Sequence, residues 1–345
     1  MLHQQRVLVT GGTGYIGSHV AVQLIEHGHK VMLLDNTDRP KVREGIARIV
    51  GRAPSFVSAD IRNRVALRTI FEEGNYDAVV HCAALKILPE SLRYPIQYWD
   101  SNVAGTLNVL LSMQHACCNR ILFASSAAVY EESSYPLTEI DSTHSDNPYG
   151  QTKLAVEQVL EAATRATDIS GVSFRIFNPL GAHESGLLSE PITESPTGVL
   201  HRLFLARKGR IGKFEIHGSD WPTLDGTCVR DYLHVCDVAR AFRLALEELH
   251  PDFGELPAYS CMNLGSEKAT SVLDLVEAVN CLPRDEATAA IRVVYGDRRP
   301  GDIGRVVASS RVARDLLGWK TERSLEATVR DGWNATEIEC DTSLS

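Results

Sequence analysis

The sequence contains no long apolar run. Hydrophobic residues make up 44% of its 345 residues, yet no uninterrupted apolar stretch reaches the roughly 18 residues that a membrane-spanning helix needs. The amino-terminal residues MLHQQRVLVT also lack the apolar core of a signal peptide. We therefore expect a protein that neither enters a membrane nor is secreted, and that works in the cytoplasm.

Basic residues are in the minority. Lys and Arg number 35 against 44 Asp and Glu, which gives a formal net charge of -9. This balance argues against nucleic acid or an anionic membrane as a partner. An anionic substrate would have to be held by a local group of cations.

Motifs typical of metal centres, disulfide frameworks and serine hydrolases are missing as well. The eight cysteines include the neighbours Cys117 and Cys118 but no C-x-x-C, so we expect neither a zinc site nor a disulfide framework. No G-x-S-x-G occurs, which disfavours a serine hydrolase. We expect His27 and His29 to be exposed at a helix end and His81 to be a core histidine, so no metal site is predicted.

What the chain does contain, in its first half, is a regular alternation of β-branched runs and amphipathic stretches. Strands that alternate with helices of this length favour right-handed βαβ units and a parallel sheet covered on both faces. The sequence therefore predicts an α/β protein with a doubly wound parallel sheet, a Rossmann fold. The predicted strands are 6–10, 30–35, 55–60, 77–84, 120–126 and 172–178, and the helices between them are 15–27, 63–73, 96–118 and 149–166.

The alternation stops after Pro179. Residues 181–198 are rich in Gly, Ser and Pro and indicate a loop. We predict a dinucleotide-binding domain over 1–178 and a smaller, mixed α/β portion over 179–345 that binds the substrate, with the chain free to cross between the two. Helices are expected in this second portion at 199–208, 237–249, 271–281 and 309–317.

A glycine loop follows the first strand directly. Gly12, Gly14 and Gly17 form G-x-G-x-x-G, and Gly11, Gly14 and Gly17 form an overlapping frame. Glycine at these points allows a tight turn, close approach of the backbone to a pyrophosphate, and a helix amino terminus that faces the phosphates. Asp35 lies 18 positions past Gly17, where a carboxylate accepts a ribose 2′-hydroxyl and repels a 2′-phosphate. The loop therefore predicts a dinucleotide site that prefers NAD to NADP, although Arg39 is close by.

A second motif, NPYGQTK, covers residues 147–153. Asn147 can cap a helix and Pro148 suits its first position, so Tyr149 and Lys153 lie one turn apart on a stripe that continues through Val156, Leu160 and Ala163. A free tyrosine has a pKa of about 10, which leaves roughly one phenolate in a thousand at pH 7. Lowering this pKa by about three units requires roughly 4 kcal/mol. A cation about 4 Å away, helped by an oxidised nicotinamide, could supply that energy.

Together with Ser126 at the end of the strand 120–126, these residues predict a general base. A phenolate at Tyr149 would remove a hydroxyl proton while hydride leaves the same carbon. Lys153 would be the cation that makes the phenol acidic.

Further motifs are spread over nearly the whole chain, among them VLVTGGTGYIGSH, LDN, ADIRN, AALK, NVAGT, SSAAVY, FRIFNPLGAH, DGTCVRDYLHVCDVA, MNLGS and RRPGDI. With NPYGQTK they resemble the extended short-chain dehydrogenase/reductase superfamily, and most closely the UDP-galactose 4-epimerases. DGTCVRDYLHV is far more specific than any glycine loop. The resemblance implies bound NAD and C4 epimerisation of a UDP-hexose through a 4-keto intermediate.

The resemblance also implies roles for individual residues. Tyr149 would take the proton of the sugar 4-hydroxyl, Lys153 would hold the cofactor ribose and tune Tyr149, and Ser126 would bind the same oxygen. It implies a homodimer formed through the helices 96–118 and 149–166. NAD would contact Gly11, Gly14, Tyr15, Ile16, Gly17, Asp35, Asn36, Asp60, Ile61, Ala83, Lys86 and Phe177, besides Tyr149 and Lys153; the UDP-sugar would contact Asn178, Arg230, Arg299 and Asp302, besides Ser126 and Tyr149.

Three positions depart from the family pattern. Gly198 stands where the family usually has an asparagine whose amide binds the diphosphate, and Ser101 stands where an asparagine is expected beside the cofactor. Val306 stands where many members have an aromatic residue, and its smaller size suggests room for an N-acetyl group on the sugar. These departures concern the identity of the substrate.

Two other functions stay open. A nucleotide-sugar 4,6-dehydratase or decarboxylase would share the 4-keto intermediate, but such relatives place acidic residues where this chain has Ala127 and Ala128. Glu131 and Glu132 follow shortly after and are expected in a loop. A non-enzymatic dinucleotide-binding protein would usually lack the pair Tyr149 and Lys153.

Overall fold

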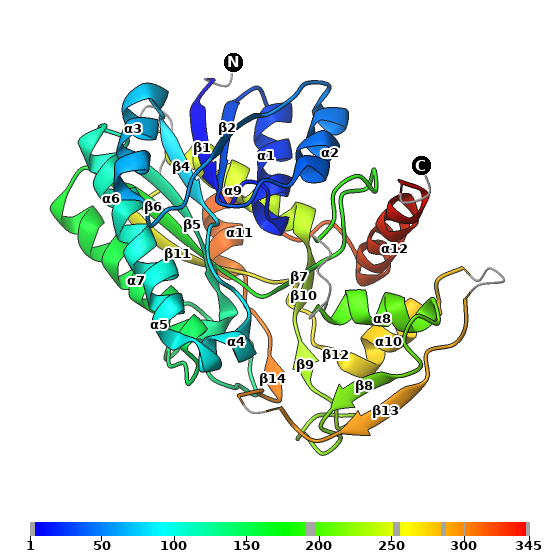
Figure 1. The fold of residues 1–345 in the computed structure, drawn as a ribbon. Coiled ribbons are helices and arrows are strands. Elements are labelled where there is room, and N and C mark those ends of the chain that lie inside the picture. Colours follow the sequence, from blue (N-terminus) through cyan, green and yellow to red (C-terminus); the bar gives the residue numbers. More distant parts are fainter. Residues whose placement is uncertain (1–3, 191–197, 251–255, 284–287, 300, 343–345) are drawn as a thin grey trace.

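The computed structural model describes residues 4–190, 198–250, 256–283, 288–299 and 301–342. Its largest element is a seven-stranded sheet with the strand order β3-β2-β1-β4-β5-β6-β11, in which all neighbours are parallel (Figure 1). This order confirms the predicted doubly wound, Rossmann-like fold. The strands are β1 (Arg6–Thr10), β2 (Lys30–Asp35), β3 (Ser55–Ser58), β4 (Ala78–His81), β5 (Arg120–Ser126), β6 (Ser170–Ile176) and β11 (Tyr259–Leu264).

Helices cover both faces of the sheet. Successive residues of β1 point to opposite faces, so Val7 and Val9 pack into one core cluster and Leu8 into another. The first cluster includes α1 (Tyr15–Glu26), α2 (Pro40–Val50), α9 (Val235–Glu248) and α11 (Arg311–Leu317); the second includes α3 (Arg64–Gly74), α6 (Gly105–His115) and α7 (Pro148–Ala166). A sheet buried on both sides explains the apolar strands of the first half.

The chain returns to the sheet after leaving it. β11 pairs with β6, and α9 packs on α1, although both elements come from beyond residue 178. The main sheet therefore includes residues from both sides of position 178, and the chain crosses between the two parts. We keep the division only as a proposal about which part binds which ligand.

Apart from β11, α9 and α11, which pack with the main sheet, the second part is built of short strands and helices (Figure 1). Its small sheets are β7–β10, β12–β9–β14 and β8–β13, and its helices pack around Leu203, Phe204 and Trp333. The elements are β7 (Asn178–Leu180), β8 (Phe214–His217), β9 (Val229–Arg230), β10 (Tyr232–His234), β12 (Thr270–Ser271), β13 (Val293–Gly296), β14 (Arg305–Val306), α8 (Val199–Arg207), α10 (Val272–Asn280) and α12 (Leu325–Thr342).

The helix that carries Tyr149 begins as the sequence predicts. In α7 the side chain of Asn147 accepts a hydrogen bond from the Gly150 N–H at 2.8 Å, and Pro148 occupies the first turn. Lys153, Val156 and Leu160 are buried along its inner stripe, whereas Tyr149 and Ala163 are half-buried.

The predicted helix 96–118 is not uniform. It consists of α5 (Pro95–Tyr98), a π-helical segment η1 (Trp99–Ala104) and α6, and it ends at His115. A π segment inside a helix is frequent at functional sites. Here it contains the buried Asn102, which accepts a hydrogen bond from the Leu85 N–H at 2.8 Å and donates one to the Leu85 carbonyl at 3.0 Å. The segment therefore fixes the chain that follows β4, where α4 (Leu88–Arg93) begins.

His27, His29 and His81 lie in different surroundings. His81 is fully buried between the hydroxyls of Thr10 and Thr106, at 2.6 and 2.8 Å, as expected of a core histidine. His27 is exposed, but His29 is buried, so the expectation for His29 is wrong. After the helix ends, the chain turns at Gly28, and the ring of His29 folds back to meet the N–H of Gln5 at 3.3 Å.

Candidate functional site

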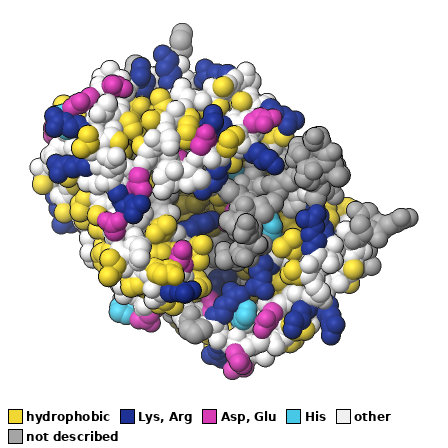
Figure 2. Space-filling model, in the orientation of Figure 1, with side chains coloured by type: hydrophobic (Ala, Val, Ile, Leu, Met, Phe, Trp, Pro, Cys, Tyr) yellow, Lys and Arg dark blue, Asp and Glu magenta, His cyan; other side chains and the backbone are white. Residues whose placement is uncertain are grey.

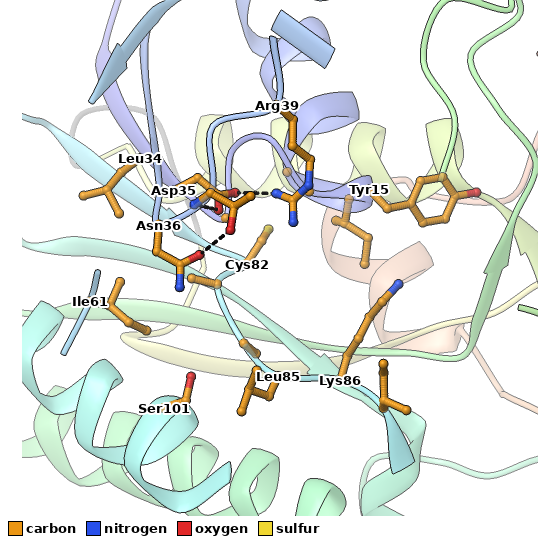
Figure 3. Close-up of a pocket in the computed structure, with 18 of the residues that line it drawn as sticks. Tyr15, Leu34, Asp35, Asn36, Arg39, Ile61, Cys82, Leu85, Lys86 and Ser101 are labelled. Atoms are coloured by element: carbon orange, nitrogen blue, oxygen red, sulfur yellow. Dashed lines mark hydrogen bonds and ion pairs between the residues drawn. The ribbon is translucent and has the colours of Figure 1, made fainter. Parts of the chain in front are cut away.

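Two cavities adjoin at the edge of the sheet where the parallel strands end. The first, the glycine-loop cavity, is lined by the ends of β1, β2 and β4 and is drawn in Figure 3. The second, the arginine cavity, lies between the end of the sheet and the second part of the chain. Ile16, Lys86, Ile87, Glu190 and Gly198 line both cavities, so a molecule in one cavity can reach a molecule in the other.

The structure gathers the predicted cofactor residues in the glycine-loop cavity, with few exceptions. Phe177 lies in the wall of the arginine cavity and not in the glycine-loop cavity. Tyr149 lines the arginine cavity, and Lys153 lines neither. The predicted residues that do line the glycine-loop cavity are Gly11, Gly14, Tyr15, Ile16, Gly17, Asp35, Asn36, Asp60, Ile61, Ala83 and Lys86.

The glycine loop is packed so tightly that side chains do not fit. A Cβ on Gly17 would lie 2.2 Å from the Gly11 carbonyl oxygen, and a Cβ on Gly11, whose φ is +65°, would lie 2.8 Å from the Ala83 nitrogen. The helix α1 starts at Tyr15 with no side-chain cap, so its first N–H groups are left to bind an anion. These residues fit the pyrophosphate of a dinucleotide.

Asp35 ends β2 with its carboxylate oriented by the backbone. Its two oxygens accept hydrogen bonds from the N–H groups of Thr13 and Thr37, at 3.2 and 3.1 Å. Arg39 points at the same carboxylate, with its Nη1 at 3.5 Å from Oδ2 and at 3.1 Å from the Thr13 hydroxyl (Figure 3). Because Asp35 engages Arg39, this arginine does not create a positive pocket for a 2′-phosphate.

Lys86 and Tyr15 lie at the other end of this cavity (Figure 3). The ammonium of Lys86 pairs with the Glu190 carboxylate at 2.7 Å, and it lies 5.9 Å from the centre of the Tyr15 ring. The Tyr15 hydroxyl donates to the Gly181 carbonyl at 2.6 Å, which ties α1 to the second part of the chain. Burial raises the pKa of Tyr15 well above its ordinary value, helped by the charge of Glu190, so this phenol stays protonated.

Tyr149 and Ser126 meet in the wall of the arginine cavity. Their side chains are hydrogen-bonded to each other, and the Ser126 oxygen also accepts the N–H of Ala128 at 3.1 Å. Burial raises the pKa of Tyr149, while the hydrogen bond from Ser126 lowers it. The net direction within the chain is upward.

Lys153 is buried beneath this pair. Only 4% of it is exposed; its ammonium donates to the Ala124 carbonyl at 2.7 Å and lies 4.8 Å from the ring centre of Phe123 and 5.8 Å from that of Tyr149. Burial lowers the pKa of Lys153 to about 8.

The expected tuning of Tyr149 by Lys153 stays a prediction, since it includes the positive charge of a bound oxidised nicotinamide. The pKa of Tyr149 is raised, and its two causes, burial and Ser126, do not include the lysine. Lys153 donates to a backbone carbonyl, and burial disfavours its own charge. A net lowering of the pKa of Tyr149 needs positive charge beside the phenol, in addition to the hydrogen bond from Ser126.

The arginine cavity gathers the residues predicted for a nucleotide sugar: Ser126, Tyr149, Asn178, Arg230, Arg299 and Asp302. Arg230 pairs with Asp302 at 3.2 Å, and its other donors reach the carbonyls of Val229 and Gly304. Arg230 is thus held in place by its own chain.

The three departures from the family pattern fall in different places. Gly198 lines both cavities at the start of α8, and Ser101 lines the glycine-loop cavity. Val306 is buried in β14 opposite Arg230 of β9 and does not line either cavity.

Several contributing residues were missed in the sequence. The buried pair Arg175–Glu157, at 2.8 Å, ties β6 to α7 and also engages Ser125, next to Ser126. No local pattern signals such a pair, because its members are 18 positions apart on different elements. Arg202, by contrast, lies on the predicted helix 199–208, four residues after Gly198, so a cation one helical turn from that departure could have been noticed.

Two absences concern the described residues alone. Among them no group of three or more His, Cys, Asp and Glu side chains could hold a metal ion. In the same part of the chain, no helix has the length and apolar character to cross a membrane.

Comparison with known proteins agrees with this geometry. The chain is 40% identical to a UDP-glucose 4-epimerase of Haemophilus influenzae over 95% of this chain and 96% of that protein. It is 36% identical to a bifunctional UDP-glucose 4-epimerase and UDP-xylose 4-epimerase of Pisum sativum, over 96% and 95% of the two chains.

Solved structures are similar over nearly the whole chain. A UDP-glucose-4-epimerase from Stenotrophomonas maltophila with bound NAD and formylated UDP-arabinopyranose has a TM-score of 0.92 and 39% identity, covering 98% of this chain and 100% of that one. A UDP-glucose 4-epimerase from Bifidobacterium longum in complex with NAD+ and UDP has a TM-score of 0.90 and 34% identity, covering 97% and 99%. These relatives confirm the resemblance to the UDP-sugar 4-epimerases. Since residues 7–256 also match its family model, the chain belongs to the NAD dependent epimerase/dehydratase family.

Proposed function

We propose that this protein catalyses the NAD-dependent interconversion of a UDP-hexose and its C4 epimer through a 4-keto intermediate. The observation that carries the proposal is the position of Tyr149 and Ser126, in the wall of a cavity that opens into the glycine-loop cavity. A sugar carbon beside Tyr149 is then within reach of a dinucleotide. The related UDP-glucose 4-epimerases support the same activity.

The glycine-loop cavity holds the cofactor in this proposal. The N–H groups at the start of α1 bind the pyrophosphate, and the oriented carboxylate of Asp35 accepts a ribose hydroxyl. When bound in its oxidised form, NAD supplies the acceptor for the hydride of C4 and one positive charge.

Tyr149 moves the proton. Its phenolate accepts the proton of the sugar 4-hydroxyl as C4 is oxidised, and the phenol returns it to the 4-keto oxygen when the sugar is reduced on its other face. Ser126, hydrogen-bonded to Tyr149, orients the same oxygen. Because burial keeps Tyr149 a phenol within the chain alone, the reaction depends on positive charge gained with the cofactor and on the ammonium of Lys153.

The nucleotide part of the substrate is assigned to the arginine cavity. Arg230, Arg299 and Asn178 contact the diphosphate and Asp302 lies near the uridine ribose. An arginine fork matches phosphate oxygens in pairs, which gives an acidic protein the local cations it needs. Val306 motivates the further hypothesis that N-acetylated sugars are accepted.

We further propose a homodimer through the helices of 96–118 and 149–166. Apolar side chains stand exposed on and before this helical region, with Ile96 80%, Leu111 42% and Leu107 40% exposed. Sedimentation of wild type and Leu111→Glu tests the dimer; a wild-type monomer would refute it.

The cysteines bear on the compartment. The seven described cysteines form no disulfide among themselves, which fits a reducing compartment such as the cytoplasm.

The test of the activity is a product analysis. The purified protein is incubated with UDP-glucose, UDP-galactose, UDP-GlcNAc and UDP-GalNAc, and the products are assigned by NMR. Formation of C4 epimers is expected, including the N-acetylated pair. An unsaturated or deoxy-keto sugar would indicate a dehydratase, no change would overturn the proposal, and exclusive use of UDP-glucose and UDP-galactose would defeat only the hypothesis drawn from Val306.

A further inference from the structure

The arginine cavity is lined by more cationic than anionic side chains. Among the described residues it is lined by four cations, Lys86, Arg202, Arg230 and Arg299, and by three carboxylates, Glu190, Glu215 and Asp302. Two ion pairs are internal, Lys86–Glu190 at 2.7 Å and Arg230–Asp302 at 3.2 Å. Figure 2 shows Lys and Arg side chains gathered in the hollow on this face of the molecule.

Two guanidinium groups are left over. Within the described part of the chain, neither Arg202 nor Arg299 has a hydrogen bond or an ion pair with a carboxylate. The guanidinium of Arg202 lies 5.6 Å from the centre of the Phe214 ring. The carboxylate of Glu215 lies against the backbone of Gly296, where a Cβ would be 2.1 Å from its Oε1. Within the described residues no ion pair joins Glu215 to either arginine, although its charge raises the pKa of Arg202.

The two arginines are close enough to repel each other. The charge of Arg299 lowers the pKa of Arg202, in addition to the larger effect of burial, and only Glu215 acts in the opposite sense. Two like charges that face one cavity cost free energy unless an anion sits between them. An anion with two or more charges, spread over oxygens a few ångströms apart, removes that cost.

We propose that Arg202 is a substrate-binding residue that, together with Arg299, binds the diphosphate group of the nucleotide sugar. The inference rests on the proposed function and adds a residue to it. Arg202 stands one helical turn after Gly198 on α8, and both line the cavity. In this proposal the guanidinium of Arg202 binds the diphosphate, the group that Gly198 cannot bind because it has no side chain.

The proposal predicts a loss of affinity with little change in chemistry. Because the diphosphate does not react, Arg202→Gln should raise KM about 10- to 100-fold and leave kcat within about threefold, since hydrogen bonds to charged groups are among the stronger ones. The affinity for UDP itself, measured by calorimetry on the holoprotein, should fall by the same factor. The affinity of Arg202→Gln should also depend less on NaCl concentration than that of wild type, because one phosphate-bound cation is gone.

Arg298→Gln is the matched control. It removes the same charge one position before Arg299, but Arg298 pairs with Asp220 at 2.8 Å and does not line the cavity. Its UDP affinity and salt dependence should equal those of wild type. Arg202→Lys, which keeps the charge but loses the fork, should fall between wild type and Arg202→Gln.

The outcomes separate this inference from the proposed function. If Arg202→Gln binds UDP as Arg298→Gln does, the inference is wrong even where epimerisation is found. If the wild type binds UDP through Arg202 but turns over no sugar, the inference is supported and the proposed epimerase activity is refuted. If Arg202→Gln is less stable, Arg202→Lys decides: equal loss of UDP affinity in both variants, with an unchanged salt dependence, would show a packing role against Phe214.

Discussion

The two cavities recognise their ligands by opposite means. The glycine-loop cavity is shaped mainly by backbone: Gly11 and Gly17 lie where a Cβ would collide with neighbouring main chain, a Cβ on Gly14 would come within 3.1 Å of the Gly11 oxygen, and helix N–H groups face the space. The arginine cavity is shaped by side chains, above all Arg202, Arg230 and Arg299, which come from separate elements. One site is defined by side chains that must be missing, the other by side chains that must be present.

This difference has consequences for substitutions. A change in the glycine loop moves the backbone and should affect folding and cofactor binding together. A change in the arginine cavity removes one contact and should affect affinity alone. Tyr149 lines the arginine cavity, but in the proposed reaction it acts on the sugar carbon that the cofactor must reach, so it tests whether the effects on the two cavities can be separated.

The largest effect is expected from Tyr149→Phe. It removes the only atom of this side chain that can move a proton, and positioned acid–base groups contribute about 10²- to 10⁴-fold, so kcat should fall by that factor. NAD content, read by absorbance after denaturation, and UDP affinity should stay as in wild type. Near-normal turnover would rule out Tyr149 as the base, and loss of either ligand would break the separation of the cavities.

Gly17→Ala changes the glycine-loop cavity, which is shaped by backbone. A Cβ placed 2.2 Å from the Gly11 oxygen forces the turn and α1 apart, at a cost of about 1–3 kcal/mol or more in the free energy of unfolding. Urea denaturation should show this loss together with loss of bound NAD. Gly212→Ala, where a Cβ meets nothing within 4 Å, is the matched control and should lose neither.

Lys153→Met tests the buried charge beneath both cavities. Since the pKa of Lys153 is lowered from 10.5 to about 8, the native protein releases this proton above pH 8 while the unfolded chain keeps it up to about pH 10.5. The unfolded state then binds more protons, so wild type should gain about 2 kcal/mol of stability between pH 7 and 10 relative to Lys153→Met. Urea titrations at both pH values measure it; a difference that does not change with pH would contradict the buried charge.

The smallest effect is expected from Asp35→Asn, at the one point where the glycine-loop cavity relies on a side-chain charge. Without the carboxylate, Arg39 is released from its 3.5 Å contact, and repulsion of a 2′-phosphate ends. The ratio of NAD to NADP affinity should fall about 10-fold, measured by titration of nucleotide-free protein. A preference that stays unchanged would show that this cavity discriminates by backbone alone.

Much of the first half could be predicted because its signals are local. The six predicted strands all form, since each is a short β-branched run next to a turn, and α7 starts at Asn147 because cap, proline and stripe are neighbours in sequence. The helix α2 was overlooked although Pro40 opens it and Ile46 is buried on its inner face. Its signal was present, since Val42, Ile46, Ile49 and Val50 follow the spacing of one helical stripe.

The second half was harder because its elements are short and depend on partners. β9, β12 and β14 have two residues each and exist only because they pair with one another. β11 is longer, but it is a strand of the main sheet only through its pairing with β6, 83 or more positions away in the chain. Phe177 was assigned to the cofactor and lies in the arginine cavity for the same reason: the chain turns away from the sheet at that point, into β7.

By itself the sequence determined the parallel sheet, the glycine loop with its acidic partner and the pairing of Tyr149 with Lys153 on one helix, because each depends on residues within a few turns of one another. Only the tertiary structure decided how Lys153 acts and which arginines are unpaired. Burial sets the pKa of both residues of the pair, and burial is a sum over segments that are far apart in the chain. The same holds for Arg202, because only the tertiary structure brings its charge into one cavity with Arg299.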